Sequence, residues 1–344
     1  MTAPRTAFLT NDALTRKRWA NDLFMVMLKA VEFNDLIGKG TDSIIQMRTE
    51  LGKGQGDQIK FGIRRPLVGE GIVGTDTVEG NEEMLRFKDF SMTIEELNHA
   101  VDTGGVMEEQ RVPYDLMSEG KSALQDWWSD KLSDYVINTL AGNSTFTIAG
   151  QVFAQACTEP DPGHKITVND VAEASMTAAD VADLSYLDRL KQRAELPGIG
   201  CDKVRPLKMG GKNYYRVIVH NYVFDQLRIN TNVGQWGDML RSANKLATPN
   251  VEIEYNGLLI SKSERIPALY ANIYRCVLIG AQAATFAWGG AGESKSSTMS
   301  FVPYERDAKR YVMIRGGGIF GCKKVTFDSK DYGVITGASY ASSL

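Results

Sequence analysis

The sequence holds few of the residues that build metal sites and catalytic sites. Its 344 residues include three histidines and four cysteines. The cysteines, Cys157, Cys201, Cys276 and Cys322, form no C-x-x-C pair, whereas zinc sites use closely spaced ligand pairs and disulfide frameworks belong to short secreted chains. The histidines are widely separated, and no H-E-x-x-H motif is present. We therefore expect reduced structural thiols, no metal site and no bound cofactor.

Long apolar runs and a strong charge imbalance are also absent. No run of about 18 apolar residues occurs, so no transmembrane helix is expected. The N-terminus lacks the apolar segment and cleavage site of a secretory signal. The formal net charge of −3 argues against tight general binding of nucleic acid. We expect a protein made in a cytosol, without a membrane partner, that touches DNA weakly or through a local patch.

Motifs for catalysis and nucleotide binding are incomplete. Gly69, Gly71 and Gly74 satisfy G-x-G-x-x-G, but no helical pattern follows them to present N–H groups to a pyrophosphate. A G-x-S-x-G elbow is missing. Cys–His catalysis stays open because its partners meet only in the fold, although nothing in the sequence favours it. We expect no enzyme; a cytosolic nucleotide-binding enzyme that uses these glycines is the alternative of a different class.

Glycine is concentrated instead in one segment, Gly52–Glu83. Two β-like runs, Gln58–Arg64 and Leu85–Ile94, flank its tip. This pattern predicts a long two-stranded arm with a glycine-rich end that projects from the body. Because an isolated hairpin is marginally stable in water, the arm requires a partner surface, which in this chain is another protein or a second copy.

Helical periodicity predicts a helix at Leu14–Val31 and a much longer one at Pro113–Leu140, which would span about 42 Å. Ala141-Gly142-Asn143 is the predicted stop of the long helix. The expected core residues of the long helix are Leu124, Trp127, Trp128 and Leu132. Three aspartates on the same helix are spaced four residues apart, at Asp126, Asp130 and Asp134. We interpret them as a solvated face, since calcium loops need glycine and varied oxygen ligands.

The rest of the chain is predicted to be a loop-rich stretch followed by α/β segments. Residues 145–173 show little periodicity, and short helices are predicted at Ala178–Glu195, near Tyr222 and at Trp236–Leu246. Gly316–Gly318 are predicted to separate two strands near the C-terminus. Lys323 and Lys324 are interpreted as an edge-strand guard against mispairing; a covalent crosslink or a nucleic-acid contact is the alternative.

Several short sequence segments, taken together and in order, resemble the major capsid proteins of tailed bacteriophages, in particular the coat proteins of N-four-like podoviruses. They are GQGDQIKFGIRRPLVGEGIVG with EGNEE (54–83), WW (127–128), LAGN (140–143), YNGLLI (255–260), LIGAQAATFA (278–287) and GIFGCKKVTFDSKDYGVI (318–335). Residues 145–212 carry little of the resemblance.

The resemblance implies an α+β fold, the capsid fold that tailed phages share with herpesvirus floors and encapsulins. The implied parts are an N-terminal arm and helix (1–51), an extended loop (52–94), a peripheral domain with the spine helix (95–144), an axial domain (145–315) with a surface insertion (145–212), and C-terminal strands that return to the peripheral domain (316–344).

It also implies that copies of the chain form hexamers and pentamers of an icosahedral head around double-stranded DNA, assembled in the bacterial cytoplasm with scaffold, portal and decoration proteins as candidate partners. The residues expected to bend the loop or to contact a neighbouring subunit are Arg64, Arg65, Gly69, Glu70, Gly71, Gly74, Asp76, Glu79, Glu82 and Glu83. Each exposed ion pair contributes only about 0–1 kcal/mol, so many such contacts would hold a shell together. The alternative within the same fold is an encapsulin-like compartment that encloses protein cargo.

Overall fold

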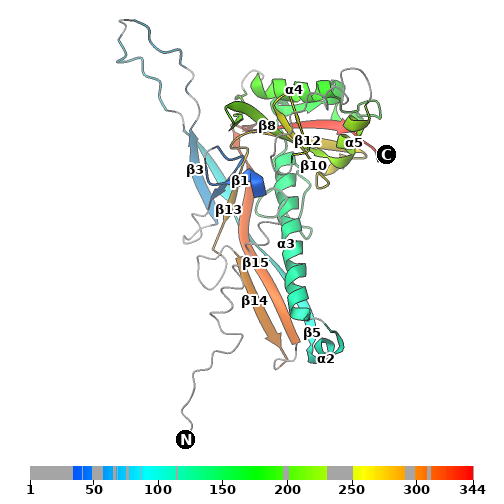
Figure 1. The fold of residues 1–344 in the computed structure, drawn as a ribbon. Coiled ribbons are helices and arrows are strands. Elements are labelled where there is room, and N and C mark those ends of the chain that lie inside the picture. Colours follow the sequence, from blue (N-terminus) through cyan, green and yellow to red (C-terminus); the bar gives the residue numbers. More distant parts are fainter. Residues whose placement is uncertain are drawn as a thin grey trace.

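The computed structural model describes residues 34–40, 42–48, 57–64, 67, 69–74, 77–85, 87–113, 115–196, 201–230, 251–290, 299–307 and 311–343. The predicted helices at Leu14–Val31 and Trp236–Leu246 lie outside these residues. The described part is an α+β structure with two main sheets joined by one long helix, and an arm extends away from both sheets (Figure 1).

The first sheet, called the long sheet below, has six strands in the order β1-β2-β13-β15-β14, with β5 also paired to β15. Its strands are β1 (Ile37–Gly38), β2 (Ile45–Arg48), β5 (Glu95–Gly105), β13 (Ala284–Trp288), β14 (Met299–Arg306) and β15 (Tyr311–Lys324). β15 has 14 residues and pairs antiparallel with β5, β13 and β14, so it is the centre of this sheet.

The second sheet has eight strands in the order β6-β18-β12-β8-β10-β9, with β11 beside β12 and β7 beside β8. Its strands are β6 (Lys165–Thr167), β7 (Leu207–Met209), β8 (Lys212–His220), β9 (Ile253–Tyr255), β10 (Leu258–Ser263), β11 (Ala268–Tyr270), β12 (Ile273–Ile279) and β18 (Val334–Tyr340). The helices α4 (Leu184–Glu195) and α5 (Asn221–Ile229) lie beside this sheet (Figure 1).

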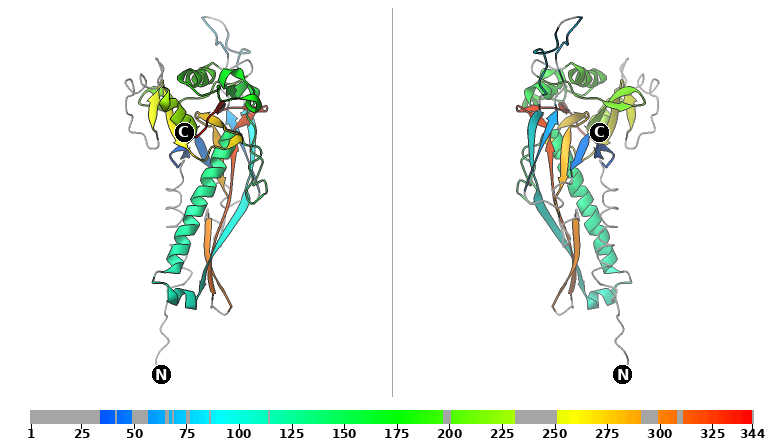
Figure 2. Two further views of the ribbon diagram at one scale, coloured as in Figure 1. Left: turned by 90° about the vertical axis from the view of Figure 1, so that its right-hand side faces the viewer. Right: turned by 90° about the vertical axis from the view of Figure 1, so that its left-hand side faces the viewer.

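Helix α3 (Leu116–Ala141) is the predicted long helix and runs beside β5, β14 and β15 (Figure 2). The side chain of Asp115 accepts a hydrogen bond from the Met117 N–H and so caps its first turn. Gly142 ends it in the left-handed conformation, with φ of 66°, as the Ala-Gly-Asn stop predicted. A short helix, α2 (Val106–Arg111), links β5 to α3.

The remaining elements are two hairpins and several 3₁₀ turns. The hairpins are β3 (Gln58–Arg64) with β4 (Phe87–Thr93), and β16 (Thr326–Phe327) with β17 (Lys330–Asp331). The 3₁₀ turns are η1 (Asn34–Leu36), η3 (Pro162–His164), η4 (Val168–Asp170) and η5 (Glu173–Ser175). Among the described residues, no helix combines the length and the apolar character that a membrane span requires.

The glycines 316–318 do not separate two strands, as we predicted, but lie inside β15. A Cβ added at Gly316 would stand 2.7 Å from Trp128 Nε1 and 2.9 Å from Leu124 Cδ2 on α3. Gly316 therefore lets the long helix approach the sheet closely, and Gly317 leaves room for Asn98 of β5. These glycines make room for neighbouring side chains rather than break the strand.

The interpretation of Lys323 and Lys324 as an edge guard is wrong. Both residues pair with β13, at Thr285 and Ala284 respectively. The Lys323 ammonium donates to the Ser91 carbonyl oxygen at 2.7 Å and lies 4.9 Å from the centre of the Phe90 ring. Lys324 is fully buried, and its Nζ lies 2.8 Å from Asp331 Oδ2. Both lysine side chains therefore make these contacts within the subunit.

Residues 145–212 are not a surface insertion. β6 pairs parallel with β18 and becomes an outer strand of the eight-stranded sheet. Tyr186, Leu187 and Leu190 of α4 are buried in the main core. The predicted segment 316–344 is also divided, because β15 lies in the long sheet whereas β18 lies in the eight-stranded sheet. Likewise β13 and β14, which we placed in the axial domain, belong to the long sheet.

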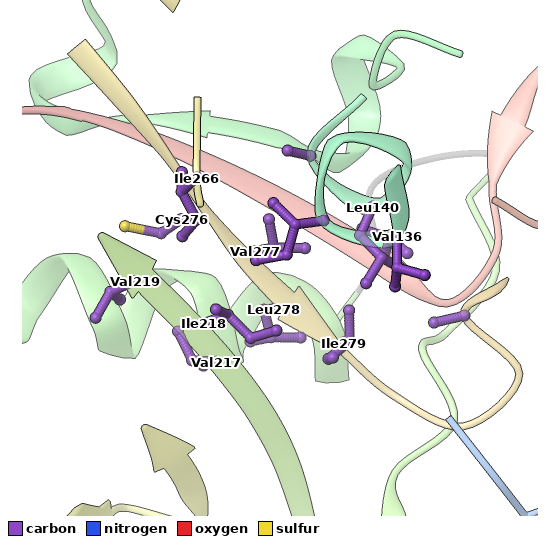
Figure 3. Packing of buried hydrophobic residues seen from close by; sticks show 14 of the residues in the cluster. Val136, Leu140, Val217, Ile218, Val219, Ile266, Cys276, Val277, Leu278 and Ile279 are labelled. Atoms are coloured by element: carbon purple, nitrogen blue, oxygen red, sulfur yellow. The ribbon is translucent and has the colours of Figure 1, made fainter. Parts of the chain in front are cut away.

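The C-terminal end of α3 enters the core between the two sheets. Every residue from Tyr135 to Ala141 is buried, and Figure 3 shows Val136 and Leu140 beside Val277 of β12. Arg275 of β12 donates from Nη1 to the Ala141 and Gly142 carbonyl oxygens, at 3.1 and 2.9 Å. A cation at this position satisfies the unpaired carbonyl groups at the end of the helix and complements its dipole.

Arg275 is itself held by Glu173 in a two-point ion pair, with Nε–Oε1 and Nη2–Oε2 distances of 2.9 Å. Lys165 Nζ adds a contact of 2.7 Å to the same carboxylate. Burial alone would raise the pKa of Glu173, but the hydrogen bonds from Arg275 and Lys165 outweigh burial and hold the pKa below its usual 4.5. The charged carboxylate is thus the form that the fold favours.

We expect Glu173→Gln to destabilise the subunit by about 3–5 kcal/mol at pH 7, because Arg275 would keep a buried charge without its anion. A folded-state pKa that is lowered contributes stability above the unfolded value, and this contribution is lost as the pH falls through the folded value. The gap between wild type and variant should therefore begin to narrow as the pH falls below about 4. Urea unfolding across this range measures it.

The control for this experiment is Glu109→Gln, since Glu109 is exposed on α2 and far from the buried pair in sequence. This change should leave urea unfolding unaltered within about 0.5 kcal/mol at every pH. A stability gap for Glu173→Gln that stays constant between pH 7 and pH 3 would contradict the assigned role of the carboxylate.

Candidate assembly surface

The arm begins as a regular antiparallel hairpin. Its register runs from Gln58 opposite Thr93 to Arg64 opposite Phe87, which confirms the predicted strands closely. Ile59, Phe90 and Met92 are buried at its base. They form a small separate core together with Ile94, Ala287, Val325, Phe327 and Tyr332. The base of the arm is therefore part of the folded body and does not depend on a neighbouring molecule.

Beyond this base, the described residues of 67–85 extend away from both sheets (Figures 1 and 2). We call this segment the outer loop. Large apolar side chains are exposed along it: Leu67 by 61%, Val73 by 85%, Val78 by 63%, Met84 by 83% and Leu85 by 58%. Isolated exposed apolar residues are common, but several on one projecting segment indicate a surface for another molecule.

The outer loop is shaped by its own hydrogen bonds. The Gly69 N–H donates to Glu83 Oε2 at 2.7 Å and so ties the two sides of the loop together. The Gly80 N–H donates to Glu82 Oε2 at 2.9 Å. Gly71 and Gly74 adopt positive φ values of 79° and 78°, which favour glycine. The loop thus holds a defined path before any neighbour binds.

The predicted contact residues therefore divide into groups. Glu82 and Glu83 already bind backbone N–H groups of the loop, whereas Glu70 and Glu79 are exposed and have no ion pair among the described residues. Arg64 ends strand β3. Arg65 and Asp76 lie outside the described residues. The exposed carboxylates, not the arginines, are the charged groups of the outer loop that the structure places.

The spine residues Leu124, Trp128 and Leu132 are buried as predicted, with Trp128 0% exposed. Trp128 faces the Phe320 ring of β15 edge-on, with ring centres 6.0 Å apart. Trp127 is only partly buried and packs against the same core, so it lies at the edge of the core rather than fully inside it. Its ring stacks on His99 of β5 at 4.1 Å, on the flank of the helix.

The aspartates of α3 are not merely solvated. Arg265 donates from Nη2 to Asp130 Oδ1 at 2.6 Å and from Nη1 to Asp134 Oδ1 at 2.8 Å. Arg265 follows β10 of the eight-stranded sheet. Asp126 and Asp130 are exposed as expected, whereas Asp134 is partly buried. The i, i+4 spacing presents two carboxylates to one guanidinium, and this contact ties the helix to the second sheet.

The glycine motif of the outer loop does not form a nucleotide site. Described residues 77–85, which follow Gly74, contain turns and extended backbone and no helix. A pyrophosphate would need helical N–H groups at that place. The alternative of a nucleotide-binding enzyme thus loses the structural feature on which it depended.

A further cluster of potential metal ligands was not predicted from the sequence. Asp161, His164 and Cys201 come together with one potential ligand atom from each within 4.8 Å of the others. The separation of 37 residues between His164 and Cys201 hides this group in the sequence. The missing close-spaced ligand pairs say nothing about residues this far apart in the chain.

Comparison with known proteins decides the family. The profile of a family described as phage capsid protein matches residues 6–259, well over half of the chain. The chain belongs to the phage capsid protein family. A major capsid protein of Pseudomonas phage KPP25 is 24% identical over 320 residues, which are 86% of this chain and 80% of that protein. This member of the phage capsid family is a major capsid protein, a structural protein of the phage shell.

Solved structures show the same fold. The capsid of Ralstonia phage GP4 matches with a TM-score of 0.78 and 22% identity, over 92% of this chain and 91% of that chain. The Cyanophage Pam1 capsid matches with a TM-score of 0.71 and 16% identity, over 98% and 97% of the two chains. The predicted tailed-phage capsid fold is confirmed. The finer resemblance to N-four-like podoviruses stays a prediction.

An encapsulin of Synechococcus elongatus also shares the fold, with a TM-score of 0.52 and 10% identity over 98% of this chain and 93% of that chain. At this identity the match concerns the fold alone. The family profile and the Pseudomonas phage relative both describe phage capsid proteins, so the phage function, not the encapsulin function, is the one supported.

Proposed function

We propose that this capsid protein assembles into hexamers and pentamers, and that its outer loop lies over the neighbouring subunit within each ring. The observation that carries the proposal is the outer loop itself. Its apolar side chains are exposed, and its hydrogen bonds among the described residues join loop residues to one another. A neighbouring copy is the partner that occurs next to every loop in a symmetric shell.

The charge of the loop indicates what the neighbouring surface presents. Residues 66–86 contain the acids Glu70, Asp76, Glu79, Glu82 and Glu83 against the single base Arg86. The receiving surface would combine apolar area with lysine or arginine. Rim charges of this kind contribute orientation and association rate more than affinity, whereas burial of the apolar side chains contributes about 25 cal/mol per Å².

The described elements support the assignment of two domains within the subunit. The long sheet with α3 would be the peripheral domain and the eight-stranded sheet the axial domain, which meets its copies at the ring axis. Residues 52–94 would be the extended loop and residues 1–51 the N-terminal arm. Compared with the boundaries expected from sequence, β13 and β14 move to the peripheral domain, and β18 moves to the axial domain.

The proposed partners follow from the role of a phage shell. We expect assembly in the bacterial cytoplasm with a scaffold and a portal protein, with or without a decoration protein, around double-stranded DNA. The formal net charge of −3 fits weak, non-specific contact with the genome. We propose that the chain performs no catalysis and that its contribution is structural.

Electron microscopy with light scattering on the purified chain tests this function. Closed shells, or rings of five and six subunits, are the expected result, with scaffold co-expressed where the chain alone stays monomeric. The contents separate the two shell functions: packaged DNA supports the phage capsid, whereas a defined protein cargo supports an encapsulin-like role. A chain that stays monomeric with scaffold present contradicts the proposal.

A further inference from the structure

Three side chains of different chemistry meet beside the eight-stranded sheet. Asp161, His164 and Cys201 each bring one atom able to bind a metal ion, and these atoms lie within 4.8 Å of one another. Asp161 Oδ1 and His164 Nδ1 are 2.7 Å apart. His164 is buried, whereas Asp161 and Cys201 are partly exposed, so solvent reaches the group from one side.

Local structure places the first two of these side chains. Asp161 precedes the 3₁₀ turn η3 and His164 ends it. Residues three apart on a 3₁₀ turn lie nearly above one another, which brings the carboxylate and the imidazole together. β6 starts directly after His164 and pairs with β18, so the imidazole sits at a fixed point of the sheet.

Cys201 is brought in by contacts on both sides of the following segment. The Val204 N–H donates to the Ala194 carbonyl oxygen at the end of α4, and the Arg205 carbonyl oxygen accepts from the Ala281 N–H. The sulfur lies over Gly163, where an added Cβ would stand 2.5 Å from Sγ and 3.2 Å from Asp161 Oδ2. The absence of a side chain at Gly163 is what allows the thiol to reach the turn.

The imidazole offers the ion its Nδ1 atom. Nδ1 lies 2.7 Å from Asp161 Oδ1, so this nitrogen and this oxygen are on the same side of the ring and can bind one ion. His164 is 1% exposed, and the buried position holds the ring in this orientation.

We propose that Asp161, His164 and Cys201 form a zinc site, with a solvent molecule as the fourth ligand. Thiolate, imidazole and carboxylate are the three ligand types that Zn²⁺ uses in proteins. A tetrahedral site with bonds of about 2.0–2.3 Å has ligand atoms about 3.3–3.8 Å apart. The observed separations range from 2.7 Å, between Asp161 Oδ1 and His164 Nδ1, to at most 4.8 Å. Binding would therefore need small side-chain rotations that open the first pair slightly and bring the sulfur closer.

On binding, the Cys201 thiol gives its proton to solvent and the thiolate sulfur binds the ion. The ion would connect the turn before β6 to Cys201, whose segment is held to the end of α4 at Val204 and to Ala281, just after β12, at Arg205. It would close a loop of about 40 residues and restrict the unfolded chain. The inference is independent of the proposed shell assembly, because all three ligands belong to one subunit.

The first experiment uses the wild-type full-length subunit and the reactivity of its own cysteines. Cys157, Cys276 and Cys322 are buried, whereas Cys201 is partly exposed, so iodoacetamide should label Cys201 first. After removal of metal with a chelator, one equivalent of Zn²⁺ should slow this labelling by at least about tenfold, because the bound thiolate is no longer a free nucleophile. Peptide mass mapping identifies the labelled cysteine.

The second experiment identifies the ligands. Co²⁺ added to the metal-free subunit should give a thiolate-to-cobalt charge-transfer band and the intense visible bands of a four-coordinate site, at one ion per subunit. Cys201→Ser should remove the charge-transfer band, and His164→Gln should weaken Zn²⁺ binding by at least about tenfold. The matched controls, Cys157→Ala and His99→Gln, should retain the wild-type spectrum and stoichiometry.

The two experiments distinguish a zinc site from its absence. Protection of Cys201 by Zn²⁺ with a cobalt–thiolate band supports the site, even where a variant fails to fold. Labelling of Cys201 at the same rate with and without Zn²⁺, or a cobalt spectrum without a thiolate band, overturns it. Shell assembly of the metal-free protein does not bear on the result, so failure of this proposal and failure of the proposed function are distinguishable.

Discussion

Deletion of residues 67–81 should give a subunit that folds normally and no longer forms closed shells. The hydrogen bonds of the outer loop join its own residues, and the core at the base of the arm contains Ile59, Phe90 and Met92, which the deletion leaves in place. Seven residues, 65, 66 and 82–86, remain to connect β3 to β4, which is enough for a hairpin loop. Circular dichroism and electron microscopy measure the two results.

A variant of unchanged length tells whether the apolar side chains themselves are needed. Leu67→Ser, Val73→Ser and Val78→Ser together keep the backbone of the outer loop and remove three of its exposed apolar side chains. We expect this triple variant to assemble poorly, with a melting temperature within about 2 °C of wild type, because surface changes rarely alter stability. Normal shells from the deletion variant would disprove the role of the loop.

The adjacent tryptophans of α3 should respond very differently to truncation. Trp128→Ala removes a fully buried side chain that packs on Phe320 and over Gly316, and it should cost about 3–5 kcal/mol of subunit stability. Trp127→Ala removes a partly buried ring stacked on His99, and it should cost about 1–2 kcal/mol. Urea unfolding of the free subunit measures both values.

The pair forms its own matched control, since both changes remove the same atoms from neighbouring positions of one helix. The comparison also tests the close approach between α3 and β15, because the cavity left by Trp128 would lie against the glycines of that strand. Equal losses of stability for the two variants would contradict the packing described for this face of the helix.

Local signals predicted the elements whose cause is local. The alternating pattern of Gln58–Arg64 predicted β3 with its observed bounds, because strand periodicity depends on neighbouring residues. The Ala-Gly-Asn stop predicted the end of α3 at Gly142, because a left-handed cap needs glycine. The glycine-rich outer loop was found in the same way.

The features that sequence reasoning missed depend on distant partners. The carboxylates of Asp130 and Asp134 look solvated along the helix, and their cation, Arg265, lies 131 residues beyond Asp134. Gly316 is a strand breaker by local rules and a packing site only because Trp128 faces it. The fold can bury Lys324 because Asp331, on the following hairpin, pairs with its ammonium group at 2.8 Å. In each case the local residue type is compatible with two roles, and tertiary contact selects one.

The way in which the chain alternates between the two sheets has a mechanical consequence. β12 lies in the eight-stranded sheet, β13 and β15 lie in the long sheet, and β18 returns to the eight-stranded sheet beside β12. Arg275 of β12 binds the carbonyl groups at the end of α3 and so fixes the helix between the two sheets. Across the described residues we therefore expect the two sheets to unfold as one cooperative unit. In the proposed rings of five and six subunits, the difference in curvature would then fall on the arm and on the contacts between copies.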